Sequence, residues 1–272
     1  MNSSFVERKD TDGATPGEPA LSFEERHWAR IGMRAVDDFR VRALNQRILG
    51  LLARPIGSVL DIGCGSGVFS LEASQHAVDV MGIDISASQI AVAREIFSAR
   101  SLSPDRLRCC SIQQIVREAR RFNYCVALDV LEHIEDRQEF LRLVGDALLP
   151  GGQLVACVPA APEFFDHRDE LSGHYLRYTP EILRAELETA GWVVTEMMYW
   201  NWLGWFIRTL EQPFRRGKGY NNYDFRYSEG RLQRLLNRAL LIYFLAIENN
   251  LRPPIGMSLI VRAQPNSALS IG

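Results

Sequence analysis

The sequence predicts an α/β fold built on a mostly parallel sheet, and two observations support this prediction. Short apolar runs typical of buried strands alternate with helical segments between about residues 56 and 200. Such alternation favours strands that are joined by helices covering both faces of one sheet. The first apolar run then enters a glycine-rich turn, Val-Leu-Asp-Ile-Gly-Cys-Gly-Ser-Gly, at residues 59–67. Glycine tolerates positive φ angles, so this backbone can turn tightly beside a ligand.

The remaining elements follow from periodicity and capping residues. Residues 1–20 are polar and aperiodic, as in a disordered arm, and residues 21–54 repeat apolar residues at helical spacing. Ser86, Asp136 and the pair Thr179-Pro180 are typical of helix N-termini. We expect strands at residues 58–62, 78–84, 106–111, 124–128, 153–158, 192–199 and 257–263, with helices between most of them.

The connection before the last strand is too long to be a plain turn. It begins with the aromatic residues Trp200, Trp202, Trp205 and Phe206, continues through a basic stretch at 215–218, and ends in a helical run at 229–250. The aromatic residues are compatible with core packing or with an aromatic binding site. We predict a helical cap over the substrate side of the sheet at residues 201–255, followed by the last strand at 256–264. Arg215 or Arg216 could meet one anionic group of a ligand.

Composition restricts the class of protein. The chain has 272 residues, of which 47% are hydrophobic, and a formal net charge of −2. This size fits one globular domain at residues 21–272, and the charge disfavours nucleic acid as a partner. The five cysteines form no C-x-x-C pair and indicate a reduced, cytoplasmic environment. We find no long apolar run typical of a membrane span, and a homodimer is compatible with the sequence.

The glycine turn becomes more specific when it is combined with Asp84, which ends the second expected strand. A dinucleotide-binding fingerprint would need glycine at position 68, where this chain has valine. In this chain Asp61 precedes the glycines, in the pattern D-x-G-x-G-x-G. This pattern resembles motif I of the class I S-adenosylmethionine (SAM)-dependent methyltransferases, and Asp84 resembles the acidic residue with which that family binds the ribose. The resemblance implies a Rossmann-like fold with a SAM-binding core at residues 56–200. It also implies the strand order 3-2-1-4-5-7-6, with the seventh strand antiparallel.

The resemblance also implies which residues hold SAM and its product S-adenosylhomocysteine. The glycine turn would hold the methionine moiety, Asp84 the ribose, and Ile85 with Ile112 the adenine. Arg42 lies about where related quinone O-methyltransferases place an arginine for the SAM carboxylate, or it is a solvated arginine on the surface of a helix. The full predicted cofactor set is Asp61, Gly63, Cys64, Gly65, Gly67, Asp84, Ile85, Ile112, Leu128 and Asp129.

The segment Asp129-Val-Leu-Glu-His-Ile134 follows the fourth expected strand, at the edge where open α/β sheets bind ligands. Three interpretations remain open. Glu132 and His133 could simply orient the loop, or His133 could be a general base, since an imidazole titrates near neutral pH. In the third, Asp129, Glu132, His133 and His174 hold a divalent metal, as in E-x-x-E-H methyltransferases. The sequence has aspartate where that motif begins with glutamate, so a metal is not favoured.

His174 is the second candidate base, in the segment Gly173-His-Tyr-Leu-Arg-Tyr-Thr179. Alternatively, His174 and Tyr178 simply hold this loop in place. This segment resembles a stretch found in methyltransferases that act on small molecules or glycans. Together these residues predict transfer of the SAM methyl group to a hydroxyl of an apolar, aromatic, lipid-linked or glycan-linked acceptor. The alternatives are a metal-dependent RNA methyltransferase, methylation of carbon or nitrogen in a natural product, and a SAM-binding protein without activity.

Overall fold

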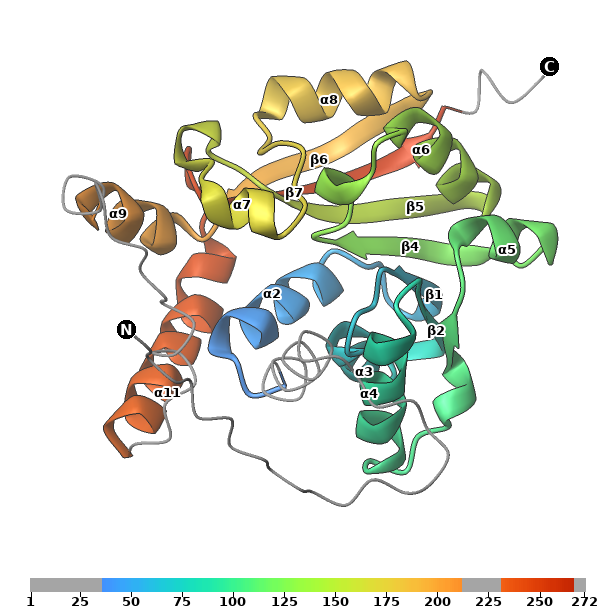
Figure 1. The fold of residues 1–272 in the computed structure, drawn as a ribbon, viewed down its shortest axis with the longest axis horizontal. Helices are drawn as coiled ribbons and strands as arrows, with labels where there is room; N and C mark the ends of the chain where they lie inside the picture. The colour runs from blue at the N-terminus through green and yellow to red at the C-terminus, as the bar shows by residue number, and fades with distance from the viewer. Residues whose placement is uncertain (1–35, 212–230, 267–272) are drawn as a thin grey trace, which may run out of the picture.

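The computed structural model describes residues 36–211 and 231–266 (Figure 1). The expected arm at 1–20, the first part of the expected helices at 21–54, and the basic stretch at 215–218 lie outside the described residues.

Seven strands form one sheet in the order β3-β2-β1-β4-β5-β7-β6. β7 is antiparallel to β5 and β6, whereas the other neighbouring strands are parallel. Strand order and direction therefore confirm the expectation from the family resemblance. The strands are β1 (Ile56–Ile62), β2 (Ala77–Asp84), β3 (Leu107–Cys109), β4 (Phe122–Leu128), β5 (Leu148–Pro159), β6 (Trp192–Trp200) and β7 (Ser258–Pro265).

Helices cover both faces of the sheet, as predicted (Figure 1). On one face, Ile115, Leu141 and Leu183 join a core with the inward side chains of the strands. On the other face, Ile48, Phe69 and Phe244 join a second core. The helices are α2 (Phe39–Leu49), α3 (Val68–Ala73), α4 (Ala87–Ser98), α5 (Ile112–Arg117), α6 (Arg137–Asp146), α7 (His167–Leu171), α8 (Pro180–Thr189), α9 (Trp202–Glu211) and α11 (Arg231–Ala246).

Three predicted helix N-termini are confirmed by their caps. The side chains of Ser86, Asp136 and Thr179 accept hydrogen bonds from backbone N–H groups at the starts of α4, α6 and α8. Each cap satisfies a donor that the first turn of a helix cannot pair internally. These helices consequently begin where the sequence places them.

The structure differs from the sequence prediction at several places. β5 begins at Leu148 rather than 153, because the pairing with β4 shifts register between Phe122 and Tyr124 and absorbs the Pro-Gly-Gly turn. The short helices α5 and α7 were not predicted. Trp200 belongs to the core: its side chain is 1% exposed, and its indole N–H donates to Asn249.

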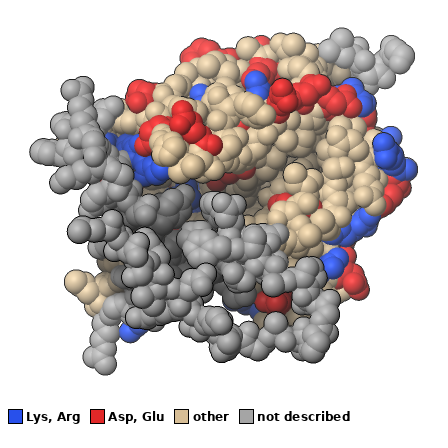
Figure 2. All heavy atoms as spheres, viewed as in Figure 1, with Lys and Arg blue, Asp and Glu red and all other residues tan. Residues whose placement is uncertain are grey.

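The described surface agrees with the near-zero net charge. On the face in Figure 2, acidic side chains gather along the upper edge, and basic side chains lie at the right edge and in a group at the left. Within residues 36–211 and 231–266, no helix combines the length and the apolar character that a membrane crossing requires.

Candidate active site

The glycine turn connects β1 to α3 and adopts the conformation that its sequence predicts. Gly63, Gly65 and Gly67 have φ angles of 69°, 52° and 73°. These are left-handed values that residues with a Cβ rarely adopt. At Gly63 space is also limiting, since a Cβ would lie 2.6 Å from Cγ2 of Val130. The backbone of the turn therefore approaches the loop after β4 more closely than any other residue type would allow.

Asp84 ends β2 beside this turn. One carboxylate oxygen accepts a hydrogen bond from the N–H of Gly65 at 2.8 Å, and the other accepts from the N–H of Ser86 at 2.8 Å. An ionised carboxylate has about four acceptor positions, so both oxygens retain capacity for further donors. Asp84 thus fixes the turn and can also accept hydrogen bonds from two hydroxyl groups.

Asp61 lies beneath the turn and is 2% exposed. It accepts a hydrogen bond from the Ser70 hydroxyl at 2.6 Å. Burial raises the pKa of Asp61 from 3.8 to about 7, against the lowering effect of Ser70. A positively charged ligand above this carboxylate would favour its ionised form.

A pocket of about 270 Å³ opens over the turn. Six predicted cofactor residues line it: Asp61, Gly63, Cys64, Gly65, Leu128 and Asp129. Helix α2 also lines the pocket, through Arg40, Leu44 and Asn45, which the sequence analysis did not name. Arg42, the expected carboxylate partner, is exposed and does not line the pocket. The arginine that reaches the pocket is Arg40, two positions earlier and on a different side of the helix.

The two residues expected to enclose the adenine have different environments. Ile85 follows β2 and exposes 81% of its surface, whereas Ile112 begins α5 and is 4% exposed within the core. Neither belongs to the pocket lining. Their role in holding adenine stays a prediction.

A second, larger pocket of about 540 Å³ adjoins the first. Arg40 and Asp129 line both pockets, so the two spaces meet at these side chains. Asp129 directly follows β4 and has a φ of 53°, in the left-handed region that aspartate adopts more readily than most residues. Its N–H donates to the carbonyl of Cys157 on β5. Asp129 thereby stands at the carboxyl edge of the sheet, where open α/β folds bind ligands.

Glu132, His133 and His174 lie together beside this junction. One potential ligand atom from each of them falls within 4.8 Å of the others. The imidazole rings are 4.7 Å apart in an edge-on arrangement. Burial and the neighbouring His174 lower the pKa of His133. The sequence prediction that these residues belong to one site is consistent with this geometry.

Glu132 is the unusual member of the cluster. Its side chain is fully buried, and neither carboxylate oxygen has a hydrogen-bond partner among the described residues. Burial, reinforced by Asp129, raises the pKa of Glu132 well above its ordinary value. A buried carboxyl group without partners is costly, so this position suits either a retained proton or a bound cation.

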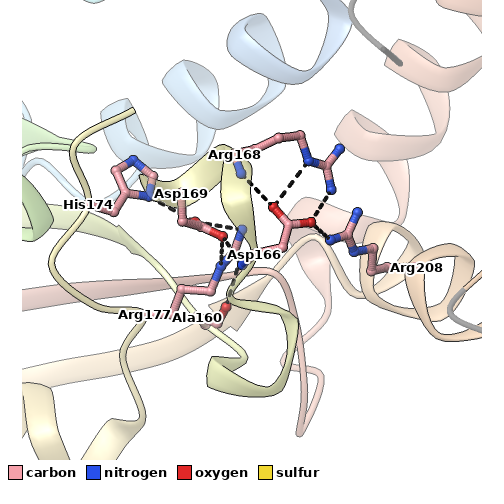
Figure 3. Close-up of polar contacts among 7 residues, drawn as sticks. All are labelled: Ala160, Asp166, Arg168, Asp169, His174, Arg177 and Arg208. Atoms are coloured by element: carbon pink, nitrogen blue, oxygen red, sulfur yellow. Dashed lines mark hydrogen bonds and ion pairs between the residues drawn. The ribbon is translucent and has the colours of Figure 1, made fainter. Parts of the chain in front are cut away.

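Asp169 holds His174 in place, and no sequence motif points to Asp169. Nδ1 of His174 lies 2.9 Å from Oδ1 of Asp169, and Arg177 binds the same carboxylate through Nε at 3.0 Å and through its terminal nitrogen at 2.9 Å (Figure 3). Asp169 is 2% exposed. Burial raises its pKa, but hydrogen bonds from Arg177, Asp166 and His174 outweigh burial and keep that pKa below its ordinary value. The ionised carboxylate can accept a hydrogen bond from Nδ1–H of His174, and in the neutral ring this tautomer leaves the lone pair on Nε2.

The cap contacts the segment that carries His174. Arg208 of α9 binds Asp166 at the start of α7, and Arg168 binds the same carboxylate (Figure 3). The Trp205 indole N–H donates to Glu163 at 3.2 Å. Leu203 and Ile207 of α9 and Leu240 and Phe244 of α11 line the second pocket. That these helices cover the substrate stays a prediction.

Comparison with known proteins agrees with this arrangement. A family model described as a methyltransferase domain matches residues 26–197, more than half of the chain. A ubiquinone biosynthesis O-methyltransferase from Azorhizobium caulinodans is 28% identical over 215 residues, which cover 72% of this chain and 83% of that relative. Another from Coxiella burnetii is 33% identical over 96 residues, covering 35% of this chain. The chain spans only 41% of the length of that relative.

Solved structures support the same fold. A Haloferax volcanii methyltransferase, solved in complex with the Trm112 methyltransferase activator, superposes with a TM-score of 0.59 at 15% identity. The match covers 90% of this chain and 99% of that chain. With the glycine turn and the seven-stranded sheet, these findings show that the chain belongs to the class I SAM-dependent methyltransferases.

Proposed function

We propose that this enzyme methylates a hydroxyl group of a small, largely apolar acceptor. The observation that supports this proposal best is the junction of two pockets at Asp129 and Arg40. The first pocket adjoins the residues predicted to hold SAM. The second presents His174 beside a lining that includes Phe39, Leu240 and Phe244. Small-molecule sites commonly combine such apolar surfaces with a few polar groups.

SAM supplies a methyl group on a positively charged sulfur. The protein contributes position and proton transfer. Asp84 and the glycine turn fix the cofactor side, and Asp129 places a negative charge at the junction. Nε2 of His174 can accept the acceptor's hydroxyl proton, because Asp169 holds the ring through Nδ1. Holding both reactants in line removes much of the entropic barrier, and a positioned base adds roughly 10²–10⁴ in rate.

The buried carboxyl group of Glu132 supports a second possibility at the same site. Glu132, His133 and His174, with Asp129 nearby, offer carboxylate and imidazole ligands that suit Mg²⁺ or Mn²⁺. Such a metal would lower the pKa of a coordinated hydroxyl group. A protonated carboxyl group at Glu132 would explain the same burial without a metal. We therefore treat the metal-dependent arrangement as the second possibility.

One assay tests the function and separates the two arrangements. Wild-type protein is incubated with methyl-labelled SAM and a panel of alkyl-substituted catechols, and the position of the label is determined by mass spectrometry and NMR. We expect the label on oxygen, with turnover that survives a chelator. Loss of turnover with chelator and its recovery with Mg²⁺ or Mn²⁺ would select the metal arrangement. Label on carbon or nitrogen would contradict the proposal.

A further inference from the structure

The second pocket combines positive charge with apolar surface. Arg168, Arg177 and Arg208 line it from the α7–α8 segment and from α9. The other lining residues include a set of apolar side chains from α2, α9, α11 and the residue before β7: Phe39, Leu203, Ile207, Leu240, Phe244 and Met257. A purely apolar acceptor would need only these apolar side chains and not the three arginines.

Two of these arginines share one carboxylate. Arg168 donates to Oδ2 of Asp166 at 2.8 Å, and Arg208 donates to the same oxygen (Figure 3). Both arginines line the pocket, whereas Asp166 is not part of its lining. The positive groups of this cluster therefore border the pocket, and the carboxylate that they share does not.

The acidic residues of the pocket do not all offset this charge. Asp169 is engaged by Arg177 and His174. Asp129 lies at the junction with the first pocket. Glu211, one turn beyond Arg208 on α9, also lines the pocket and opposes an anionic ligand.

We infer that Arg208 and Arg168 form a subsite for an oxyanion, a carboxylate or phosphate group carried by an otherwise apolar acceptor. This inference rests on the proposed function, because it assigns a chemical class to the acceptor of that site. Guanidinium groups bind planar or tetrahedral oxyanions through paired N–H donors. Packing holds Arg208 at the pocket, since its side chain is 14% exposed and its guanidinium carbon lies 5.8 Å from the centre of the Phe164 ring.

The test measures binding of simple amphiphiles by calorimetry, with the protein saturated with S-adenosylhomocysteine. Octyl phosphate, octanoate and 1-octanol each contain eight carbon atoms and differ in the head group. We expect at least one of the two anions to bind about tenfold or more tightly than octanol, as one charged hydrogen-bonded contact would give. The comparison between the two anions shows which head group the subsite prefers.

Two variants with opposite expected effects separate a binding role from a structural one. Arg208→Gln should weaken binding of the preferred anion about tenfold or more, while octanol binding stays unchanged. Asp166→Asn should strengthen anion binding, because it removes the competing carboxylate but keeps an N-cap for α7. Arg252→Gln is the matched control, since Arg252 pairs with Glu196 and is 71% exposed outside the pocket.

Each outcome has a definite meaning. Equal binding of both anions and octanol to the wild-type protein would overturn the inference. Weaker anion binding in both Arg208→Gln and Asp166→Asn would also overturn it, because Asp166 and Arg208 would then form a structural link only. A wild-type protein that fails to bind S-adenosylhomocysteine would instead contradict the cofactor side of the proposed function. Retained S-adenosylhomocysteine affinity in each variant shows that the fold is intact.

Discussion

His174 and Asp169 form a hydrogen-bonded pair beside the second pocket, with 2.9 Å between Nδ1 and Oδ1. The residues are five positions apart and are joined through the tight turn at Gly173, whose φ is 74°. Because Arg177 binds the same carboxylate, Asp169 can stay ionised although it is buried. The pair gives His174 a fixed ring orientation, as a histidine that transfers protons requires.

We predict that this pair controls turnover rather than cofactor binding. His174→Ala should lower kcat by roughly 10²–10⁴, the contribution of a positioned base, and Asp169→Asn should lower it in the same direction. The measurement is the rate with a catechol that the wild-type protein methylates, together with SAM affinity by calorimetry. His167→Ala is the control, because that histidine is 78% exposed on α7. Full activity in both His174→Ala and Asp169→Asn would remove the base from the mechanism.

Asp61 predicts a pH dependence of SAM binding. Its pKa lies at about 7 in the folded protein, and a positively charged ligand binds better to the ionised carboxylate. SAM affinity should therefore rise between about pH 6 and pH 8. Calorimetry in buffers of different ionisation heat would also detect the proton released on binding. A wild-type affinity that is independent of pH over this range, or an equally steep profile in Asp61→Asn, would contradict the assignment.

The raised pKa of Asp61 also predicts a pH dependence of stability. As pH rises, the stability of the ligand-free protein should fall, whereas SAM affinity should rise. The pKa of Asp61 is raised from 3.8 to about 7 on folding, so the folded state holds this proton more tightly than the unfolded state. The contribution of Asp61 is fully present below about pH 4 and is lost as pH rises through 7, by an amount on the order of 4 kcal/mol. Urea unfolding of ligand-free protein should show that Asp61→Asn gains stability relative to wild type between pH 5 and pH 8.

Gly63 predicts a steric effect that a second substitution relieves. Gly63→Ala places a Cβ 2.6 Å from Val130 at a φ of 69°. The left-handed conformation alone costs roughly 1–2 kcal/mol, and the contact adds to it. We expect weaker SAM binding and a lower Tm, with partial recovery in the double variant Gly63→Ala, Val130→Ala. For Tm, Gly65→Ala is the matched control, because its φ of 52° is also left-handed but no protein atom lies within 4 Å of its added Cβ.

Much of the fold could be predicted from the sequence because its determinants are local. Alternating strands and helices, the caps at Ser86, Asp136 and Thr179, and the glycine turn each act within a few residues. The missed helix α7 also has a local determinant, since Asp166 and Asp169 form a reciprocal cap. That pattern uses aspartate at both positions instead of the usual serine or threonine followed by glutamate.

The site was less predictable because its partners are distant along the chain. Arg208 meets Asp166 across 42 residues, and no spacing rule connects them. The expected SAM arginine was placed at Arg42, whereas Arg40 lines both pockets. Only the orientation of α2 decides between these two positions. Asp169 appeared in the sequence as one acid in a charged stretch, and its burial became visible only in the fold.

Asp84 predicts a specific loss of cofactor affinity. Asp84→Ala removes the carboxylate expected to bind the ribose, with charged hydrogen bonds worth roughly 1.5–3 kcal/mol each. SAM affinity measured by calorimetry should fall at least about tenfold. Because Asp84 also holds Gly65 and Ser86, Asp84→Asn is the companion variant that keeps one acceptor oxygen and should lose less. Unchanged SAM affinity in Asp84→Ala would contradict the ribose assignment.

Methyl transfer between the two pockets is best tested by a crystal structure of the complex with S-adenosylhomocysteine. We predict the ribose against Asp84, the methionine portion along Gly63–Gly65, and the sulfur atom beside Asp129, facing the pocket that contains His174. A sulfur atom directed away from that pocket, or a ligand bound elsewhere on the sheet, would contradict methyl transfer at this junction.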